Sequence, residues 1–282
     1  MTTWFITGAS RGFGLEIARQ ALERGDKVVA TARKPQDVRD TLSPCGDSLL
    51  AVALDVTDEA QAPEAVEAAV ERFGTIDVLV NNAGRGVLGA VEETSDAAFR
   101  SVYDTNVFGL ANVTRAVLPV MRRQRSGRIL NLSSIGGFES AAGFGVYCST
   151  KFAVEGLSEA MRKELAPLGI HVTIVEPGYF RTDFLDATSL HTEGQVISDY
   201  AGTAGAVRQA VPGLNRAQPG DPVKGATAVL TLAEAANPPL RAQLGSDCAA
   251  AMDHKIAQLR EETDAWRKLA LSTDHDDVKA GN

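Results

Sequence analysis

The chain has 282 residues, of which 44% are hydrophobic and 23% charged, and its formal net charge is −8. This acidic balance argues against nucleic acid or an anionic membrane surface as a partner, because both attract basic proteins. Three cysteines lie far apart with no C-x-x-C pair, which indicates a reducing compartment, so we expect a cytoplasmic protein. The four scattered histidines predict no metal site, and no apolar run is long enough to cross a membrane.

The first predicted strand covers Thr3–Thr7, and a glycine-rich turn leads from it into a helix over Leu15–Arg24. The turn has the spacing G-x-x-x-G-x-G, formed by Gly8, Gly12 and Gly14. Glycines let a pyrophosphate approach the backbone closely, and a helix N-terminus supplies N–H groups and a positive dipole. The turn is therefore interpreted either as a nucleotide site or as a tight connection without a ligand.

The second predicted strand, Lys27–Ala32, ends without a carboxylate. Proteins that select NAD usually carry an acidic residue at this point to bind the ribose 2′-hydroxyl. Here Arg33 follows Ala32, and Arg11 comes from the glycine turn, so both can pair with a 2′-phosphate. This pattern favours NADP and leaves NAD possible. The alternative is a solvated basic turn.

Apolar runs and helical periodicity continue to alternate along the chain. With short connections, this alternation predicts an α/β fold in which a doubly wound parallel sheet of about seven strands has helices on both faces. The remaining strands are expected over 49–54, 76–80, 127–132, 170–176 and 240–245, and the remaining helices over 58–73, 95–123, 147–168, 221–236 and 247–271.

Two polar features interrupt this pattern. Asn81-Asn82-Ala83-Gly84 ends the fourth strand, either as a turn or as a place where small residues let a flat ring lie against the backbone. Asn106 stands in the middle of the helix over 95–123, which Gly109 also interrupts. Asparagine is unfavourable inside a helix, so we expect a kink or a functional hydrogen bond there.

Residues 179–218 have poor periodicity and are interrupted by several glycines and prolines. About forty irregular residues inside a compact domain are typical of a binding loop, so we expect a substrate lid at 179–218. The chain ends with a helical extension at 247–271.

Tyr147 and Lys151 are four residues apart in a predicted helix, which places their side chains on one face. A lysine ammonium favours a nearby phenolate, so we expect the tyrosine pKa to be lowered and the phenol to exchange protons near neutral pH. Ser134 follows the strand over 127–132, at the edge where open α/β sheets place their chemistry. A half-exposed helix face with a solvated lysine is the alternative interpretation of the pair.

Taken together, these motifs resemble the short-chain dehydrogenase/reductase family of the compact, single-domain type, which implies one Rossmann-type domain over 1–282. The stretch from Pro239 to Asp247 and its long helix resemble the 17β-hydroxysteroid dehydrogenase-like subgroup. The matching motifs occur in the family's order, as Thr7-Gly8-x-x-x-Gly12-x-Gly14, Asp55, Asn81 to Gly84, Asn106, Ser134, Tyr147-x-x-x-Lys151 and Pro177-Gly178.

The resemblance also implies roles for individual residues. Tyr147 would donate or accept the proton, Lys151 would lower its pKa and bind the nicotinamide ribose, and Ser134 would orient the substrate oxygen. Asn106 would hold a water that links Lys151 to solvent. The implied cofactor contacts are Gly8, Ser10, Arg11, Gly12, Phe13, Gly14, Arg33, Asp55, Val56, Asn82, Ala83, Gly84, Asn106, Tyr147, Lys151, Pro177, Gly178 and Thr182.

We therefore expect an NADP-preferring oxidoreductase that interconverts a ketone or aldehyde with an alcohol. An NADP-binding regulator with little turnover is the alternative. Apolar residues in the lid and near Tyr147 favour a medium-sized, mainly apolar carbonyl substrate, unless they pack on the protein's own surface. Family members associate through the two long helices, so a homodimer or homotetramer is expected. The expected substrate contacts are Ser134, Phe138, Phe144, Tyr147 and Phe184.

Overall fold

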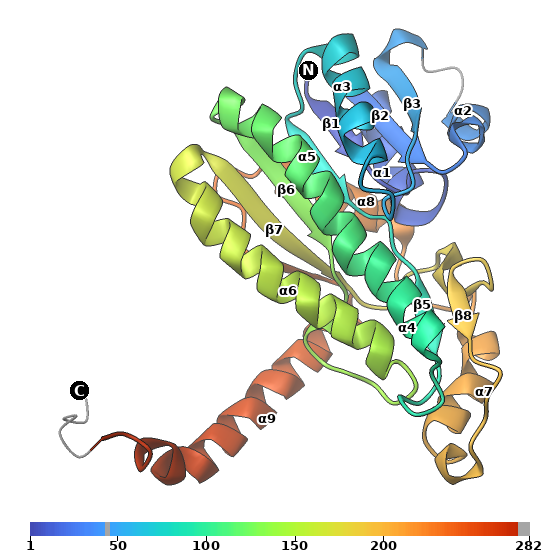
Figure 1. Cartoon of the computed structure of the whole chain (residues 1–282), viewed down its shortest axis with the longest axis vertical. Helices are drawn as coiled ribbons and strands as arrows, with labels where there is room; N and C mark the ends of the chain where they lie inside the picture. Colours follow the sequence, from blue (N-terminus) through green and yellow to red (C-terminus); the bar gives the residue numbers. More distant parts are fainter. Residues whose placement is uncertain (43–45, 276–282) are drawn as a thin grey trace.

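The computed structural model describes residues 1–42 and 46–275, and its centre is one parallel sheet (Figure 1). Seven strands follow the order β3-β2-β1-β4-β6-β7-β9. The order reverses between β1 and β4, as in a doubly wound fold, so the predicted fold class is confirmed. The strands are β1 (Thr3–Ile6), β2 (Lys27–Ala32), β3 (Leu49–Ala53), β4 (Val78–Asn81), β6 (Gly127–Leu132), β7 (Ile170–Pro177) and β9 (Arg241–Leu244).

Helices cover both faces of this sheet, and each face has its own apolar core. Small and branched side chains of α1, α2 and α8 pack on one face, and those of α3, α5 and α6 pack on the other. The strands are apolar on both faces because both are covered. The helices are α1 (Gly12–Glu23), α2 (Pro35–Leu42), α3 (Gln61–Phe73), α4 (Asp96–Tyr103), α5 (Gly109–Gln124), α6 (Gly145–Leu165), α7 (Ala204–Leu214), α8 (Pro222–Glu234) and α9 (Ser246–Leu271).

The long helix predicted over 95–123 is interrupted where Asn106 and Gly109 suggested. A π-helical turn, Asp104–Phe108, joins α4 to α5. Gly109 begins α5, where a Cβ atom would lie 2.6 Å from Val56 Cγ2. The interruption therefore lets the helix pass close to the chain that follows β3.

The segment over 179–218 is more regular than its sequence indicates. It contains α7 and the short strand β8 (Leu190–Thr192), which pairs in parallel with β5 (Gly86–Leu88). The expectation of an irregular segment is wrong at α7, because packing of Ala204, Gly205 and Val211 stabilises a helix that contains Pro212. We call residues 179–218 the 179–218 segment.

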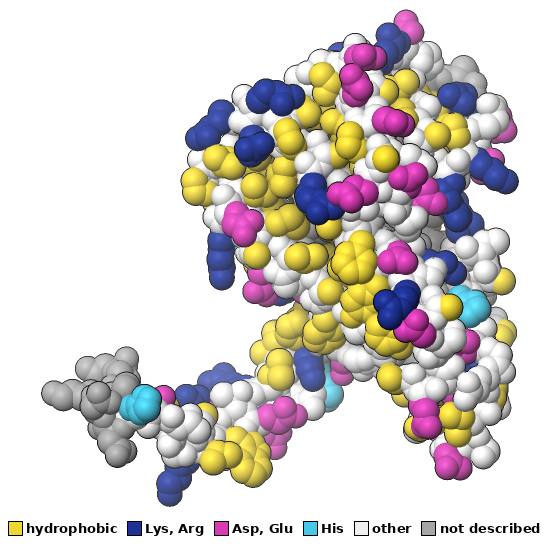
Figure 2. All heavy atoms as spheres, in the orientation of Figure 1, with side chains coloured by type: hydrophobic (Ala, Val, Ile, Leu, Met, Phe, Trp, Pro, Cys, Tyr) yellow, Lys and Arg dark blue, Asp and Glu magenta, His cyan; other side chains and the backbone are white. Residues whose placement is uncertain are grey.

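The last helix, α9, leaves the body of the protein as an arm (Figures 1 and 2). Only Cys248 and Met252 of this helix are buried. Beyond them, Ile256, Leu259 and Trp266 are exposed among charged residues. Within the described ranges, no helix combines the length and apolar character needed to cross a membrane.

Candidate active site

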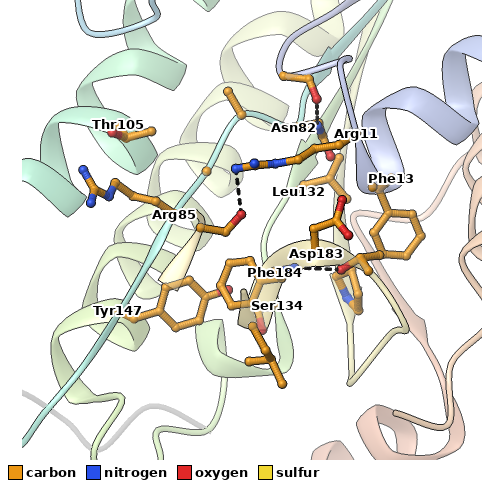
Figure 3. A pocket seen from close by; sticks show the side chains of 18 of the residues that line it. Arg11, Phe13, Asn82, Arg85, Thr105, Leu132, Ser134, Tyr147, Asp183 and Phe184 are labelled. Carbon is orange, nitrogen blue, oxygen red and sulfur yellow. Dashed lines mark hydrogen bonds between the residues drawn. The ribbon is translucent and has the colours of Figure 1, made fainter. Parts of the chain in front are cut away.

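A cleft of about 910 Å³ opens along the carboxyl ends of the central strands (Figure 3). Its walls are the residues that directly follow β1, β2, β3, β4, β6 and β7, together with parts of α6 and of the 179–218 segment. This is the position at which open α/β sheets bind ligands.

The glycine turn forms one end of this cleft. Gly8 and Gly12 have φ values of +64° and +56°, which side chains other than glycine rarely adopt. Gly14 lies behind the cleft, where a Cβ atom would be 2.5 Å from the carbonyl oxygen of Gly8. The Asn82 side chain donates to the carbonyl oxygens of Thr7 and Gly8 at 2.9 and 3.0 Å. The end of β4 therefore fixes the turn that follows β1.

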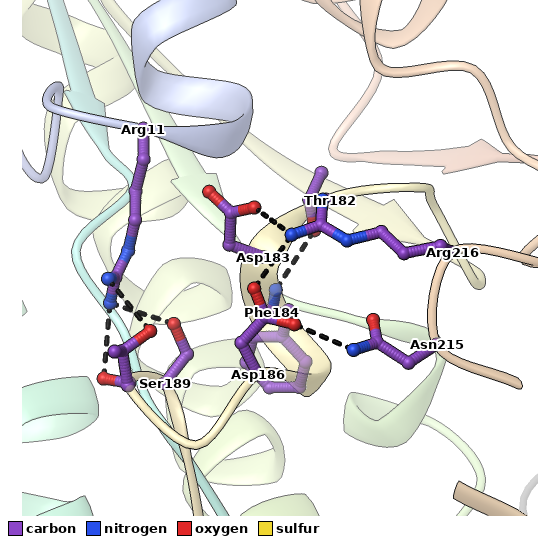
Figure 4. Close-up of polar contacts among 9 residues, drawn as sticks. Arg11, Thr182, Asp183, Phe184, Asp186, Ser189, Asn215 and Arg216 are labelled. Carbon is purple, nitrogen blue, oxygen red and sulfur yellow. Dashed lines mark hydrogen bonds and ion pairs between the residues drawn. The ribbon is translucent and has the colours of Figure 1, made fainter. Parts of the chain in front are cut away.

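Two arginines that the sequence assigns to a 2′-phosphate have different surroundings. Arg33 is exposed at the rim of the cleft, and within the described residues it forms no hydrogen bond or ion pair. Arg11 instead reaches across to the 179–218 segment (Figure 4). Its guanidinium donates to Thr188 Oγ1 at 3.0 Å, to the Thr188 carbonyl at 3.2 Å and to Ser189 Oγ at 2.8 Å. Arg33 is thus the arginine with free donors at the end of β2.

Asp55 also lies at the end of its strand and lines the cleft. Its Oδ1 accepts hydrogen bonds from the backbone N–H of Thr57 at 3.0 Å and from the Thr57 hydroxyl at 2.8 Å. Val56 lines the cleft beside it. These contacts hold the turn that leads towards α3.

Tyr147 and Lys151 lie one turn apart in α6, and both side chains are buried. The ammonium nitrogen of Lys151 donates to the carbonyl oxygen of Leu132 at 2.7 Å and lies 5.8 Å from the centre of the Tyr147 ring. Ser134 begins a short 3₁₀ turn, where its hydroxyl accepts from the backbone N–H of Gly136 at 3.1 Å. Ser134 and Tyr147 both line the cleft.

The pKa of Tyr147 is raised, so the expectation that it is lowered is wrong. Burial disfavours the phenolate, and the nearby Ser134 hydroxyl offsets only part of this effect on the pKa. Burial also lowers the pKa of Lys151 to about 8. The ammonium donates to the Leu132 carbonyl, and desolvation is the largest effect on the pKa of both Tyr147 and Lys151.

Asn106 lies behind the cleft and is 2% exposed. Its Oδ1 accepts from the backbone N–H of Arg85 at 2.9 Å, and its Nδ2 donates to the Arg85 carbonyl at 2.9 Å and to Thr150 Oγ1 at 3.0 Å. The side chain of Asn106 thus joins α6 to the chain that follows β4. These contacts are the functional hydrogen bond expected of an asparagine inside a helix.

Most residues proposed from the sequence are brought together in the cleft. Phe138 is an exception, since it does not contribute to the wall, and Gly14 and Asn106 support the wall from behind. The predicted residues that line the cleft are Gly8, Ser10, Arg11, Gly12, Phe13, Arg33, Asp55, Val56, Asn82, Ala83, Gly84, Ser134, Phe144, Tyr147, Lys151, Pro177, Gly178, Thr182 and Phe184.

Two further lining residues, Arg85 and Gln218, were missed by sequence reasoning. Arg85 directly follows the strand-end motif, so its position could have identified it. Gln218 is 1% exposed, and both polar atoms of its side chain lack a hydrogen-bond partner within the described residues. A buried amide without partners is costly, so these atoms fit a bound polar group. Together with the glycine turn, they make the cleft suitable for a dinucleotide.

Among the described residues, no group of three or more His, Cys, Asp or Glu side chains is placed to hold a metal ion.

Known proteins match this chain over most of its length. The family model described as short chain dehydrogenase matches residues 2–193. Oxidoreductase BOA17 from Botryotinia fuckeliana is 40% identical over 96% of this chain and 98% of its own length. The structure of a short-chain dehydrogenase from Streptomyces avermitilis has a TM-score of 0.90 and 40% identity, and covers 97% of this chain and 100% of that one.

A short chain dehydrogenase/reductase from Burkholderia phymatum, solved in complex with NAD, has a TM-score of 0.80 and 25% identity. The match covers 99% of this chain and 98% of that one. A nicotinamide cofactor therefore accords with both the relatives and the glycine-lined cleft. The chain belongs to the short-chain dehydrogenase/reductase family, and it is an NAD(P)-dependent oxidoreductase that acts on CH–OH and C=O groups of small molecules.

Proposed function

We propose that this protein is an NADP-preferring oxidoreductase that interconverts a ketone or aldehyde and an alcohol, with Tyr147 as the proton donor in reduction and the acceptor in oxidation. One observation carries the proposal. A buried phenol lies in the cleft that Ser134 also lines, one helical turn from the buried side chain of Lys151.

In this proposal the cofactor supplies the hydride and the protein controls the proton. The raised pKa of Tyr147 keeps its hydroxyl protonated at neutral pH, which is the form needed to protonate a carbonyl oxygen. The hydroxyls of Tyr147 and Ser134 donate hydrogen bonds to that oxygen as negative charge develops on it. The Lys151 ammonium then stabilises the phenolate that remains.

Asn106 acts in this scheme as an anchor. Its side-chain amide is fully engaged with Arg85 and Thr150, so it holds the wall behind Lys151 instead of contacting the substrate. The water that would link Lys151 to solvent stays a prediction, and we propose that the backbone near Asn106 holds it.

The NADP preference rests on Arg33. The absence of a carboxylate at the end of β2 and the unpaired guanidinium at the rim of the cleft support it, within the described residues. A charge-assisted pair with a 2′-phosphate is worth about 1.5–3 kcal/mol, so Arg33→Ala is expected to raise the KM for NADPH by at least about tenfold. The KM for NADH should stay unchanged, and equal use of NADH by the unaltered protein would contradict the preference.

The substrate end of the cleft supports a medium-sized, mainly apolar carbonyl compound. The ring centre of Phe184 lies 5.3 Å from that of Tyr147, and the ring centre of Phe144 lies 6.2 Å from it on another side. Leu185 lines the same end. Because Phe184 belongs to the 179–218 segment, we assign that segment the role of a lid that covers the substrate.

Association of subunits is proposed through the outer faces of the long helices. Phe108, Phe152 and Leu157 are 57%, 45% and 40% exposed along the π-helical turn and α6. Burying such side chains against a second copy removes apolar surface from water, which favours a dimer or tetramer. Sedimentation equilibrium of Phe152→Glu against the unaltered protein tests this assignment, and an unchanged oligomeric mass would contradict it.

The test of the function is NADPH consumption over a panel of ketones, aldehydes and quinones. Tyr147→Phe is expected to lower kcat by about 10²–10⁴, because it removes the general acid, while fluorescence titration shows NADPH binding retained. Tyr103→Phe is the matched control, since the Tyr103 hydroxyl bonds Ser149 outside the cleft. Undiminished turnover in Tyr147→Phe would overturn the assignment. NADPH binding with no turnover by the unaltered protein would indicate a regulator.

A further inference from the structure

Beneath the cleft, three charged side chains lie between α6, β7 and β9 and have no part in the chemistry described so far. We call Glu155, Glu176 and Arg241 the buried acid cluster. Glu155 is 5% exposed and Glu176 is 0% exposed. Arg241 Nε lies 3.1 Å from Glu155 Oε2 and 3.5 Å from Glu176 Oε1. Two buried carboxylates thus face one guanidinium, which the half-exposed Glu159 also contacts at 2.5 Å.

This cluster adjoins the proposed active site through Glu155. Glu155 follows Lys151 by one helical turn, and both side chains are on the buried face of α6. The 3₁₀ turn that begins at Ser134 packs on the same carboxylate, because a Cβ atom at Gly137 would lie 2.9 Å from Glu155 Oε1. That oxygen has no hydrogen-bond partner among the described residues. Glu155 therefore lies between the active-site turn and Arg241.

Lys151 needs a nearby negative charge. Lys151 is 6% exposed, and its ammonium donates to one carbonyl oxygen, that of Leu132. Burial without an opposite charge favours the neutral amine, which could not stabilise a Tyr147 phenolate. Within the described residues, Glu155 is the carboxylate whose charge opposes this effect.

We propose that Glu155 is a positioning residue whose carboxylate keeps the Lys151 ammonium protonated at the pH at which the enzyme works. The inference rests on the function proposed for Lys151. Glu155 acts through Lys151 and does not touch the reacting atoms.

The other groups around Glu155 set when this charge forms. The pKa of Glu155 is raised to about 7, chiefly by burial; Ser133 and Arg241 lower it and the neighbouring Glu176 raises it. Glu159 and Cys248 are the remaining titratable groups at the cluster. Arg241 Nε, 3.1 Å from Glu155 Oε2, favours the charged form of this carboxylate. We therefore expect the counter-charge to be present while Lys151 is an ammonium.

The proposal can be tested by titrating Lys151 directly. The purified chain is labelled with [13Cε]lysine, and the Lys151 resonance is assigned by its absence from Lys151→Met. In Glu155→Gln the midpoint of this resonance is expected to fall by about one pH unit, a tenfold loss of the ammonium form at a given pH. The alkaline limb of the kcat profile should move with it, and Glu155→Asp should restore much of both.

Glu159→Gln is the matched control, since it removes the half-exposed partner of the same arginine and should leave the Lys151 midpoint unchanged. A folded Glu155→Gln protein with an unchanged midpoint would overturn the proposal. Should Glu155→Gln not fold, the unaltered protein supplies the second measurement. Ionisation of Glu155 should shift the Lys151 resonance in a separate step at a pH below the Lys151 midpoint, and a single transition would again contradict the proposal. The NMR midpoint needs no turnover, so a failure of this inference is distinguishable from a failure of the proposed function.

Discussion

The wall of the cleft formed by the glycine turn is held by backbone bonds of the sheet and by the Asn82 side chain, whereas the opposite wall adds charged side chains to its short β5–β8 pairing. At the glycine turn, the backbone N–H of Thr7 bonds the Val80 carbonyl at 3.0 Å, and that of Ala9 bonds the Thr31 carbonyl at 2.9 Å. These bonds extend the sheet into the turn. The shape of this wall therefore follows from the fold itself.

The 179–218 segment depends instead on charged side chains. Glu93 is 1% exposed, and its Oε1 accepts from the backbone N–H of Ile197 at 2.9 Å while its Oε2 contacts Arg208 at 2.5 Å. Arg216 pairs with Asp183 and Asp186, at 2.7 Å each (Figure 4). Such contacts can break one at a time, so we expect this wall to open more readily than the sheet unfolds.

The largest effect is expected at the backbone-held wall. Gly14→Ala places a Cβ atom 2.5 Å from the Gly8 carbonyl oxygen, so the turn must shift, and we expect the free energy of unfolding to fall by about 2–4 kcal/mol. Gly156→Ala is the matched control, because a Cβ atom there meets nothing within 4 Å in α6. Because alanine has a higher helix propensity than glycine, Gly156→Ala should raise the free energy of unfolding by about 0.5–1 kcal/mol. Urea unfolding of both variants measures the contrast, which equal stabilities would refute.

The same contrast explains what could be predicted from the sequence. The glycine turn follows from a local pattern of strand, turn and helix, and Tyr147 and Lys151 follow from helical spacing. The position of Arg11 in the glycine turn predicts a phosphate contact, but not its bonds to Thr188 and Ser189, because those residues are remote in sequence. Phe138 was assigned to the substrate from its nearness to Tyr147 along the chain, which does not fix where a loop residue lies.

The pKa of Tyr147 and the helix α7 were unpredictable for a related reason. Spacing shows that Lys151 is near Tyr147, but not that burial desolvates both side chains. Likewise, Pro212 and Gly213 disfavour α7 locally, and only its packing against the body stabilises it.

A smaller effect is expected on breaking the anchor at Glu93. Backbone N–H groups of Ile197 and Ala90, and then Arg208, lower the pKa of this carboxyl. Its contribution to stability is thus fully present above the ordinary carboxyl pKa and is lost as the pH falls through the lowered value. Glu93→Gln should raise hydrogen exchange in residues 193–208 at neutral pH by about tenfold and weaken this acid dependence. Exchange in β1 and β4 should not change. Glu71→Gln is the control: Glu71 is exposed on α3, so this variant should alter exchange in neither region. Unaltered exchange over 193–208 in Glu93→Gln would show that the anchor is not what holds this wall.

The smallest effect is expected at Arg11, where the two walls meet. Its guanidinium makes three hydrogen bonds to Thr188 and Ser189 across the cleft, but it is part-exposed and competes with water for them. Arg11→Ala should therefore raise the KM of the carbonyl substrate only a few-fold, with hydrogen exchange increased over residues 186–192. Thr188→Ala removes one of the three contacts and should have a weaker effect of the same kind.

The affinity for NADPH relative to NADH decides between the two roles of Arg11. If Arg11→Ala weakens NADPH binding and spares NADH, the arginine binds the 2′-phosphate as its sequence position suggests, and it must leave the 179–218 segment to do so. If both affinities are unchanged, Arg11 joins the two walls, and Arg33 alone accounts for the cofactor preference.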